Sequence, residues 1–331
     1  MSSSRALNAI LPQIASSPYE AHQKARTFAS RYVKSNQYDV AIDVLFQSSR
    51  ELLKTGQPGS GVDLAGFLLE VYDSKGKWSV TRVELIALTG SSGSWRKTLI
   101  DKSLAWSAKH GVCPAGDQTL HHYVGELLYK EGSFEAAEPH FLASGSRDSA
   151  RLLAEEFIQW ASPSGTFGPF ALRGILPYLQ NGNVLAAKTF IKHFVSSPVI
   201  PRSSVSSPTV PVGSSSEDEI IVTQDSIINF AQLAVVTCQR AQGERNKVMR
   251  ESWVRLCGTY QSKGGVLAEP EVRKALYEIA TLYFAIPPPR NQAANPFGDM
   301  LSTLFGAPGG TGGSGSGRRL LTPAAASTGL D

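Results

Sequence analysis

Apolar and small residues recur along the chain with the three- and four-residue spacing of amphipathic helices, and their order repeats. Each copy contains two such helices joined by a short polar turn. The corresponding positions are Ala29, Tyr32, Tyr38, Ala41 and Leu45; Gly125, Leu128, Phe134, Ala137 and Phe141; and, in a weaker copy, Ile175, Tyr178, Val184, Ala187 and Ile191. Small residues at such positions let two helices cross closely, with large residues beside them. The pattern predicts stacked helical hairpins.

The same periodicity predicts thirteen helices. The first two carry the stripes Ala21 to Tyr32 and Ala41 to Leu52. The others are expected at about residues 63–72, 80–88, 94–109, 117–130, 134–143, 148–160, 166–179, 184–195, 225–240, 244–261 and 269–286. Asp117 and Asp148 stand before apolar runs, where a side-chain oxygen can accept a hydrogen bond from an unpaired amide at a helix start.

These elements predict an all-α fold, a right-handed α-solenoid of tetratricopeptide-like helical hairpins, in which each hairpin buries its apolar face against the next. The expected organisation is a flexible N-terminus, a hairpin array, an insertion, further helices and a low-complexity tail. The corresponding residues are 1–18, 19–196, 197–224, 225–289 and 290–331.

The insertion interrupts the helical pattern. Residues 197–216 are rich in Ser, Pro and Val and have no helical period. The flanking segments Val199-Ile200 and Ile220-Ile221-Val222 are β-branched, which predicts an antiparallel, β-hairpin-like ribbon near residues 198–222. Because two strands alone are marginally stable in water, we expect the ribbon to lean on another element.

One amphipathic island lies in the tail, at residues 296–306. Phe297, Met300, Leu301, Leu304 and Phe305 follow the spacing i, i+3, i+4, i+7 and i+8. A helix this short does not persist alone, so it must dock. A partner protein and the chain's own helices are both open as the docking site.

Composition excludes several classes of protein. With 42% apolar residues and 18% charged residues, the chain is globular, and it has no apolar run of the length that crosses a bilayer. The net charge of +4 is spread over interspersed charges, so no nucleic-acid partner is expected. Three distant cysteines argue against a disulfide framework, and residues 1–18 resemble no signal peptide. A cytosolic protein without membrane insertion is expected.

The sequence holds little sign of catalysis. It has no phosphate-binding loop, and the GxSxG-like segment Gly90–Ser94 follows a predicted helix instead of the strand that a hydrolase elbow needs. His110, Cys113, His121 and His122 are the densest set of possible zinc ligands, but packing and helix capping explain them better. We therefore expect the protein to be no enzyme and to bind no cofactor and no metal.

An ordered series of segments spans about residues 19–288. The segments are Tyr19–Gln23, Arg31–Val33, Ala41–Leu45, Gly59–Ala65, Glu131–Phe134, His140–Leu142, Leu172–Leu179, and Tyr277–Ile279 with Phe284–Pro288. This series resembles the Golgi-to-ER traffic protein 4 family. No segment is catalytic or unique, so the order of the whole series carries the resemblance.

The resemblance implies a non-enzymatic adaptor in the targeting of tail-anchored membrane proteins to the endoplasmic reticulum. The N-terminal half would bind the targeting ATPase. The C-terminal half would clamp a ubiquitin-like-domain protein, which recruits a tetratricopeptide co-chaperone carrying the client. The alternative is a generic tetratricopeptide-like scaffold subunit of another cytosolic complex.

Two sets of residues are candidates for these contacts. The polar faces of the N-terminal hairpins present possible ATPase-facing charges: Lys24, Arg26, Arg31, Asp63, Glu70 and Asp73. The ribbon and the last helices present possible residues for the ubiquitin-like partner: Val199, Ile200, Ile220, Ile221, Val222, Trp253, Leu256, Tyr277 and Tyr283. An ordinary solvated face is the alternative for the first set, and core packing is the alternative for each aromatic of the second.

Overall fold

A computed structural model of the chain describes residues 3–75, 82–91, 93–203, 209–212 and 219–287. These residues form fourteen α-helices, two short 3-10 helices and one two-stranded sheet. They divide into two compact units, residues 3–149 and residues 150–287. The predicted all-α class of helical hairpins with a β-hairpin-like insertion is confirmed.

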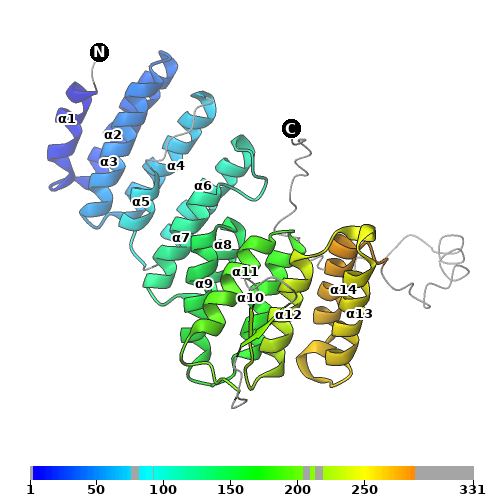
Figure 1. Cartoon of the computed structure of the whole chain (residues 1–331). Coiled ribbons are helices and arrows are strands. Elements are labelled where there is room, and N and C mark those ends of the chain that lie inside the picture. Colours follow the sequence, from blue (N-terminus) through cyan, green and yellow to red (C-terminus); the bar gives the residue numbers. More distant parts are fainter. Residues whose placement is uncertain (1–2, 76–81, 92, 204–208, 213–218, 288–331) are drawn as a thin grey trace, which may run out of the picture. The chain divides into compact units, whose positions relative to one another are not determined.

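The first unit is built from helices that pack side by side in chain order (Figure 1). Its buried core runs through α1 to α7 and is mostly Leu, Ala, Val and Ile. The helices are α1 Ser4–Ile14, α2 Pro18–Lys34, α3 Tyr38–Lys54, α4 Pro58–Lys75, α5 Arg82–Leu88, α6 Trp95–His110, α7 Gln118–Lys130 and α8 Phe134–Ser144, followed by the start of α9 Arg147–Ala161.

The repeated small residues lie where the paired helices meet. Ala29 and Ala41 are fully buried in α2 and α3. In the pair α7 and α8, a Cβ atom at Gly125 would lie 2.9 Å from Phe141 Cδ1, so only glycine leaves room for that ring. The spacing of small and large residues in the sequence therefore marks the positions where paired helices cross.

The turns of the three repeats also share one geometry. Each helix ends with a residue of positive φ, followed by an amide that donates back to the carbonyl five residues earlier, the Schellman arrangement. The residues are Asn36, Gly132 and Gly182, and the bonds run from Gln37 to Tyr32, Ser133 to Leu128 and Asn183 to Tyr178 at 2.8, 2.9 and 2.8 Å. The third copy is therefore a structural repeat despite its weaker pattern.

The N-terminus differs from the expectation of a flexible segment. Residues 4–14 form α1, and Ala6, Ile10 and Ile14 are buried in the core of the first unit. These three residues are spaced by four, so they lie on one face of the helix. Their stripe is short and Pro12 lies inside the helix, which is why the sequence pattern left this helix out.

Of the two aspartates predicted at helix starts, one caps its helix, and α4 begins at Pro58 instead of the expected residue 63. Asp117 caps α7, since its Oδ1 accepts the Leu120 amide at 2.8 Å. Asp148 does not cap α9, because the helix already begins at Arg147. The Ser149 amide instead donates to Ser146 Oγ at 3.1 Å, so a serine two positions earlier takes the capping role.

The second unit has tightly packed helices with an aromatic core. Its helices are α10 Gly168–Gln180, α11 Val184–Ser196, α12 Ser226–Gln239, α13 Lys247–Gln261 and α14 Pro270–Phe284, with 3-10 turns at Gly243–Arg245 and Gly265–Ala268. Phe157, Phe190 and Phe194 are fully buried, and Phe157 meets Phe190 edge-on at 5.9 Å between ring centroids. α13 and α14 lie side by side (Figure 1).

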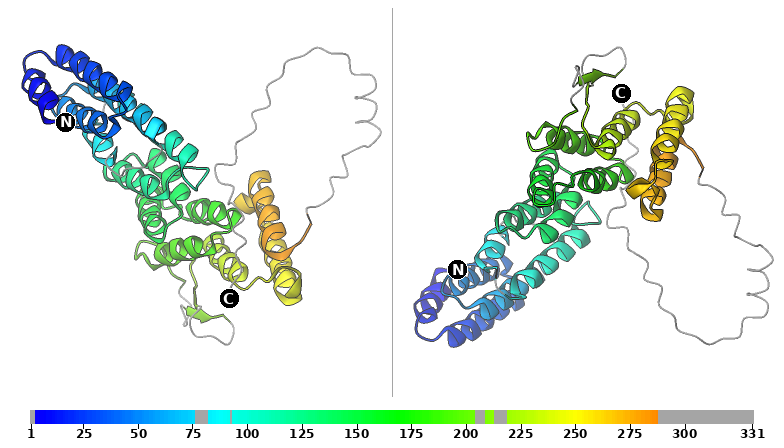
Figure 2. Two further views of the ribbon diagram at one scale, coloured as in Figure 1. Left: turned by 90° about the horizontal axis from the view of Figure 1, so that it is seen from above. Right: turned by 90° about the horizontal axis from the view of Figure 1, so that it is seen from below.

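The predicted ribbon exists, but its strands pair differently. β1 Thr209–Pro211 pairs antiparallel with β2 Glu219–Ile221, and Val210 faces Ile220. Val199 and Ile200 lie before β1 and belong to neither strand. Antiparallel pairing continues outside the two strands as an isolated β-bridge between Arg202 and Thr223. The strands project from the helices of this unit in both views of Figure 2.

No helix in the described residues is long and apolar enough to span a membrane. The amphipathic island at 296–306 lies outside the described residues.

Candidate interaction surfaces

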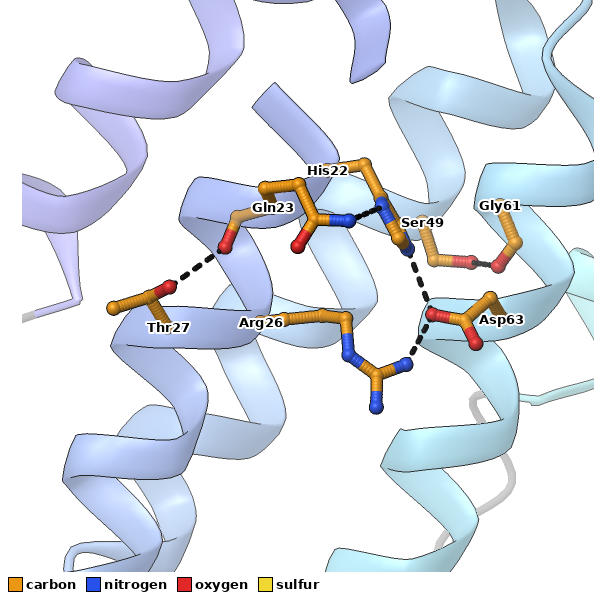
Figure 3. Close-up of polar contacts among 7 residues, drawn as sticks. All are labelled: His22, Gln23, Arg26, Thr27, Ser49, Gly61 and Asp63. Atoms are coloured by element: carbon orange, nitrogen blue, oxygen red, sulfur yellow. Dashed lines mark hydrogen bonds and ion pairs between the residues drawn. The ribbon is translucent and has the colours of Figure 1, made fainter. Parts of the chain in front are cut away.

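The carboxylate of Asp63 joins α4 to α2 in the first unit (Figure 3). His22 Nε2 lies 2.7 Å from Asp63 Oδ2, and Arg26 Nη1 donates to the same oxygen. Because a carboxylate only accepts, the His22 proton is on Nε2. His22 and Arg26 are one turn apart on α2 and therefore reach the same point. The Arg26 guanidinium also lies over the Phe67 ring of α4, 5.4 Å from its centroid.

Asp63 remains charged and accessible. Burial raises the pKa of its carboxyl, but the hydrogen bonds from Arg26 and His22 outweigh burial and bring the pKa below its ordinary value. The side chain keeps 43% of its surface exposed. A partner can therefore reach an ionised carboxylate whose position is held by two donors.

A second carboxylate, Asp73, joins α4 to α6. Lys109 Nζ donates to Asp73 Oδ2 at 2.6 Å, and His110 Nε2 contacts Asp73 Oδ1. The hydrogen bond from Lys109, followed by that from His110, lowers the pKa of the Asp73 carboxyl. The His110 ring packs on Trp106 with 4.8 Å between centroids, which fixes the imidazole.

Glu70 lies between these two acids on α4 and is exposed. Its carboxylate makes no hydrogen bond or ion pair with the residues that the structure describes. Asp63, Glu70 and Asp73 lie on one face of α4 because their spacings of seven and three follow the helical period. We call these three residues the acidic stripe of α4.

The other predicted charges of this set do not join the acidic stripe. Lys24 Nζ turns toward α1 and donates to Gln13 Oε1 at 2.7 Å. Arg31 is exposed, and its side chain has no bond with the described residues. Of the six predicted residues, the structure brings only Arg26 and Asp63 into contact.

Sequence reasoning missed His22 and Lys109 and gave His110 no role in this surface. His22 precedes Arg26 by one helical turn, which is a signal that an i, i+4 search for donors on α2 would find. Lys109 and His110 meet Asp73 from a different hairpin. No spacing of residues within one hairpin indicates that contact.

The residues predicted for the ubiquitin-like partner divide between core and surface. Ile200, Ile220 and Trp253 are buried, at 2%, 6% and 2% exposure. Trp253 stacks on Phe284 of α14 with 5.0 Å between ring centroids. For these three residues the structure supports a packing role within the chain.

The remaining residues of that set reach the surface to different degrees. Val199 and Tyr277 are 50% and 42% exposed. Ile221, Val222, Leu256 and Tyr283 are half-buried. The burial of Tyr283 raises the pKa of its phenol above the ordinary value.

The ribbon leans on α12, as expected, through a contact that the sequence did not reveal. The Gln232 side chain accepts the Ile221 amide at 2.9 Å and donates to the Ile221 carbonyl at 2.8 Å. Asn229, one turn earlier, bonds the amide and carbonyl of Thr223 in the same way, both at 2.9 Å. Two amide side chains of α12 therefore take the place of a third strand beside β2 and its extension.

His121, one of the four possible zinc ligands, contacts a second imidazole in the first unit. His121 Nδ1 lies 3.0 Å from His140 Nδ1, and His121 Nε2 lies 3.1 Å from the Ala115 carbonyl oxygen. Burial lowers the pKa of both imidazoles, that of His140 to about 4. Among the described residues there is no group of three side chains that could hold a metal ion.

Comparison with known proteins gives concordant matches over most of the chain. Residues 35–305 match the family model described as Golgi to ER traffic protein 4. The Aspergillus fumigatus protein of that name is 31% identical over 87% of this chain and 85% of its own length. The Schizosaccharomyces pombe protein is 29% identical over 88% and 92%. A crystal structure of C. therm. Get4 is similar with a TM-score of 0.76 and 31% identity, covering 97% of this chain and 99% of that one.

Proposed function

This chain belongs to the Golgi to ER traffic protein 4 family, and on that basis we propose that it is a non-enzymatic adaptor for tail-anchored membrane proteins bound for the endoplasmic reticulum. Its first unit would bind the targeting ATPase and its second unit a ubiquitin-like-domain protein, so that a tetratricopeptide co-chaperone can pass its client to the ATPase. The observation that carries the proposal is that each unit has a candidate surface of different chemistry.

The acidic stripe of α4 supports the first contact. Asp63 and Asp73 are held by donors yet remain 43% and 38% exposed, and Glu70 lies between them. Charged groups at this level of exposure speed association and select partners more than they add affinity. Such a surface suits an ATPase that must bind and leave in each targeting cycle.

The ribbon and α14 support the second contact. Val199 and Tyr277 offer exposed apolar area beside elements that are firmly packed, since Ile200 and Ile220 are buried and Gln232 holds β2. Interfaces of permanent complexes are more apolar than those of transient complexes. This chemistry suits a partner that stays bound.

The test is recovery of both partners from cytosol by the full-length chain and four single variants. Glu70→Lys changes the acidic stripe without removing a contact between described residues, and Glu135→Lys, exposed on α8, is its matched control. Val199→Asp changes the second surface, and Leu185→Asp on α11, which is also 50% exposed, is its control.

We expect Glu70→Lys to lose only the ATPase and Val199→Asp to lose only the ubiquitin-like protein, while both controls keep both partners. Loss of both partners from one variant would contradict the assignment of one partner to each unit. Recovery of neither partner by the unchanged chain would favour a scaffold subunit of another cytosolic complex.

A further inference from the structure

An open groove of about 580 Å³ runs along α13 in the second unit. It is lined by Lys247, Arg250, Glu251, Val254 and Arg255 of that helix, and by Ile286 just after α14. On the opposite side of α13, Trp253 packs into the core against Phe284. One face of α13 is therefore anchored in the core, while the other face lines the groove.

The groove is apolar at its base although its rim is charged. Val254 is 58% exposed, and the half-buried Ile286 adds a second apolar side chain. The aliphatic stems of Lys247, Arg250 and Arg255 add apolar surface while their charged ends can reach water. Exposed apolar residues grouped in a groove indicate a surface that something covers.

We propose that residues 297–305 of this same chain dock into the groove as a short helix. Phe297, Met300, Leu301, Leu304 and Phe305 have the spacing i, i+3, i+4, i+7 and i+8. The five groove residues of α13 have the same spacing, from 247 to 255. At about 1.5 Å of rise per residue, the apolar face and the groove have equal lengths, as helix-in-groove binding requires.

The described part of the chain ends beside the groove. Ile286 lines it, and only residues 287–296 separate Ile286 from Phe297. An extended chain of that length spans roughly 35 Å, which is ample for the segment to turn back along α13. A tether this short gives the segment a millimolar-scale effective concentration at the groove.

Charge favours the same occupant. The groove carries three cations and one anion, Lys247, Arg250 and Arg255 against Glu251. Asp299 is the one charged residue in 297–305. A net negative segment therefore meets a net positive rim, and the aliphatic side chains of the segment meet Val254 and Ile286.

The test is hydrogen exchange measured on the full-length chain alone. In the unchanged protein we expect the amides of 298–305 to exchange about tenfold more slowly than in an unstructured peptide, because docking protects a helix of this length. The double variant Leu301→Asp with Leu304→Asp should remove that protection. Ser302→Asp with Thr303→Asp adds the same charge on the opposite face and should keep it.

A reciprocal variant tests the groove itself. Val254→Glu should release the segment, whereas Val112→Glu, at a fully exposed position of the first unit, should not. Exchange of 298–305 at the unprotected rate in the unchanged protein would overturn the inference. Protection that grows with protein concentration would assign the groove to a second copy, and protection seen only in cell extract would assign it to a partner; either result also overturns it. The readout uses the chain alone, so it is independent of the proposed adaptor function.

Discussion

The two units secure their outer elements with different chemistry. In the first unit, Asp63 and Asp73 link α4 to α2 and α6 through ion pairs that remain about two-fifths exposed. In the second unit, a buried amide, Gln232, holds the ribbon, and a buried ring, Trp253, holds α13 against Phe284. Exposed ion pairs contribute little to stability, whereas a buried aromatic side chain contributes several kcal/mol.

This difference bears on how each surface can be used. A partner that competes for Asp63 or Glu70 displaces little stabilising energy, so binding and release can both be fast. A partner that rests on the ribbon meets a base that cannot rearrange without leaving buried polar groups unpaired. The first unit is thus suited to an exchanging partner and the second unit to a permanent one.

The largest expected effect comes from Trp253→Ala. Removal of this 2% exposed ring from its stack on Phe284 should cost about 3–5 kcal/mol of unfolding free energy, as for other buried aromatics. Urea unfolding measures this loss of unfolding free energy, and hydrogen exchange of the α13 and α14 amides shows where the loss occurs. Tyr277→Ala on α14, where the ring is 42% exposed, should cost far less. Equal losses would show that α13 is not anchored through Trp253.

Much of the fold was predictable because it follows from local periodicity. The contact of Gly125 with Phe141 and the turns at Gly132 and Gly182 each involve residues of a single hairpin. The ribbon was predicted in part. β-branched residues marked Ile220 and Ile221 as strand, but many segments of similar composition could pair with them, and Thr209–Pro211 does so instead of Val199-Ile200.

The surfaces were less predictable, since they depend on contacts between hairpins. Sequence spacing put Asp63 and Arg26 in one set, but Lys24 of the same set turns to α1. Asp73 meets Lys109 only because α4 and α6 are neighbours in the stack. The sequence does not indicate the role of Gln232, because this role depends on the strand that lies beside α12 in the fold. A side chain that replaces a missing backbone partner leaves no periodic signature.

Acid should weaken the first unit through the His121 and His140 pair. Burial lowers the pKa of His140 from about 6.5 to about 4, so the folded unit binds its proton less readily than the unfolded chain does. The neutral pair therefore stabilises the unit fully above pH 6.5, and this contribution is lost as the pH falls toward 4. The loss should approach about 3 kcal/mol.

Urea unfolding of the first unit between pH 7 and pH 4 measures this loss. His140→Gln should flatten the dependence in that window. An unchanged slope in His140→Gln would remove the buried pair as the cause.

Gln232→Leu tests the buried amide of the second unit. The leucine leaves the amide and carbonyl of Ile221 without their partners, which should cost about 1–3 kcal/mol. The amide of Ile221 should also exchange faster with solvent. Gln239→Leu changes an exposed glutamine on the same helix and should do neither. Slow exchange of Ile221 in Gln232→Leu would mean that β1 alone holds the strand.

The smallest expected effect, Asp63→Asn, is the most direct test of the contrast. Asparagine keeps an acceptor for His22 and Arg26 but removes the charge, so the loss of unfolding free energy should be about 1 kcal/mol or less. The pKa of Asp63 is lowered in the folded chain, so its contribution is present above the unfolded pKa and is lost as the pH falls through the folded value. In urea at neutral pH the difference should vanish near 1 M salt, where screening acts within about 3 Å. Glu70→Gln, which removes no contact between described residues, should leave stability unchanged at either salt concentration. A loss of several kcal/mol that persists in high salt would place Asp63 among the structural anchors and remove the difference between the two units.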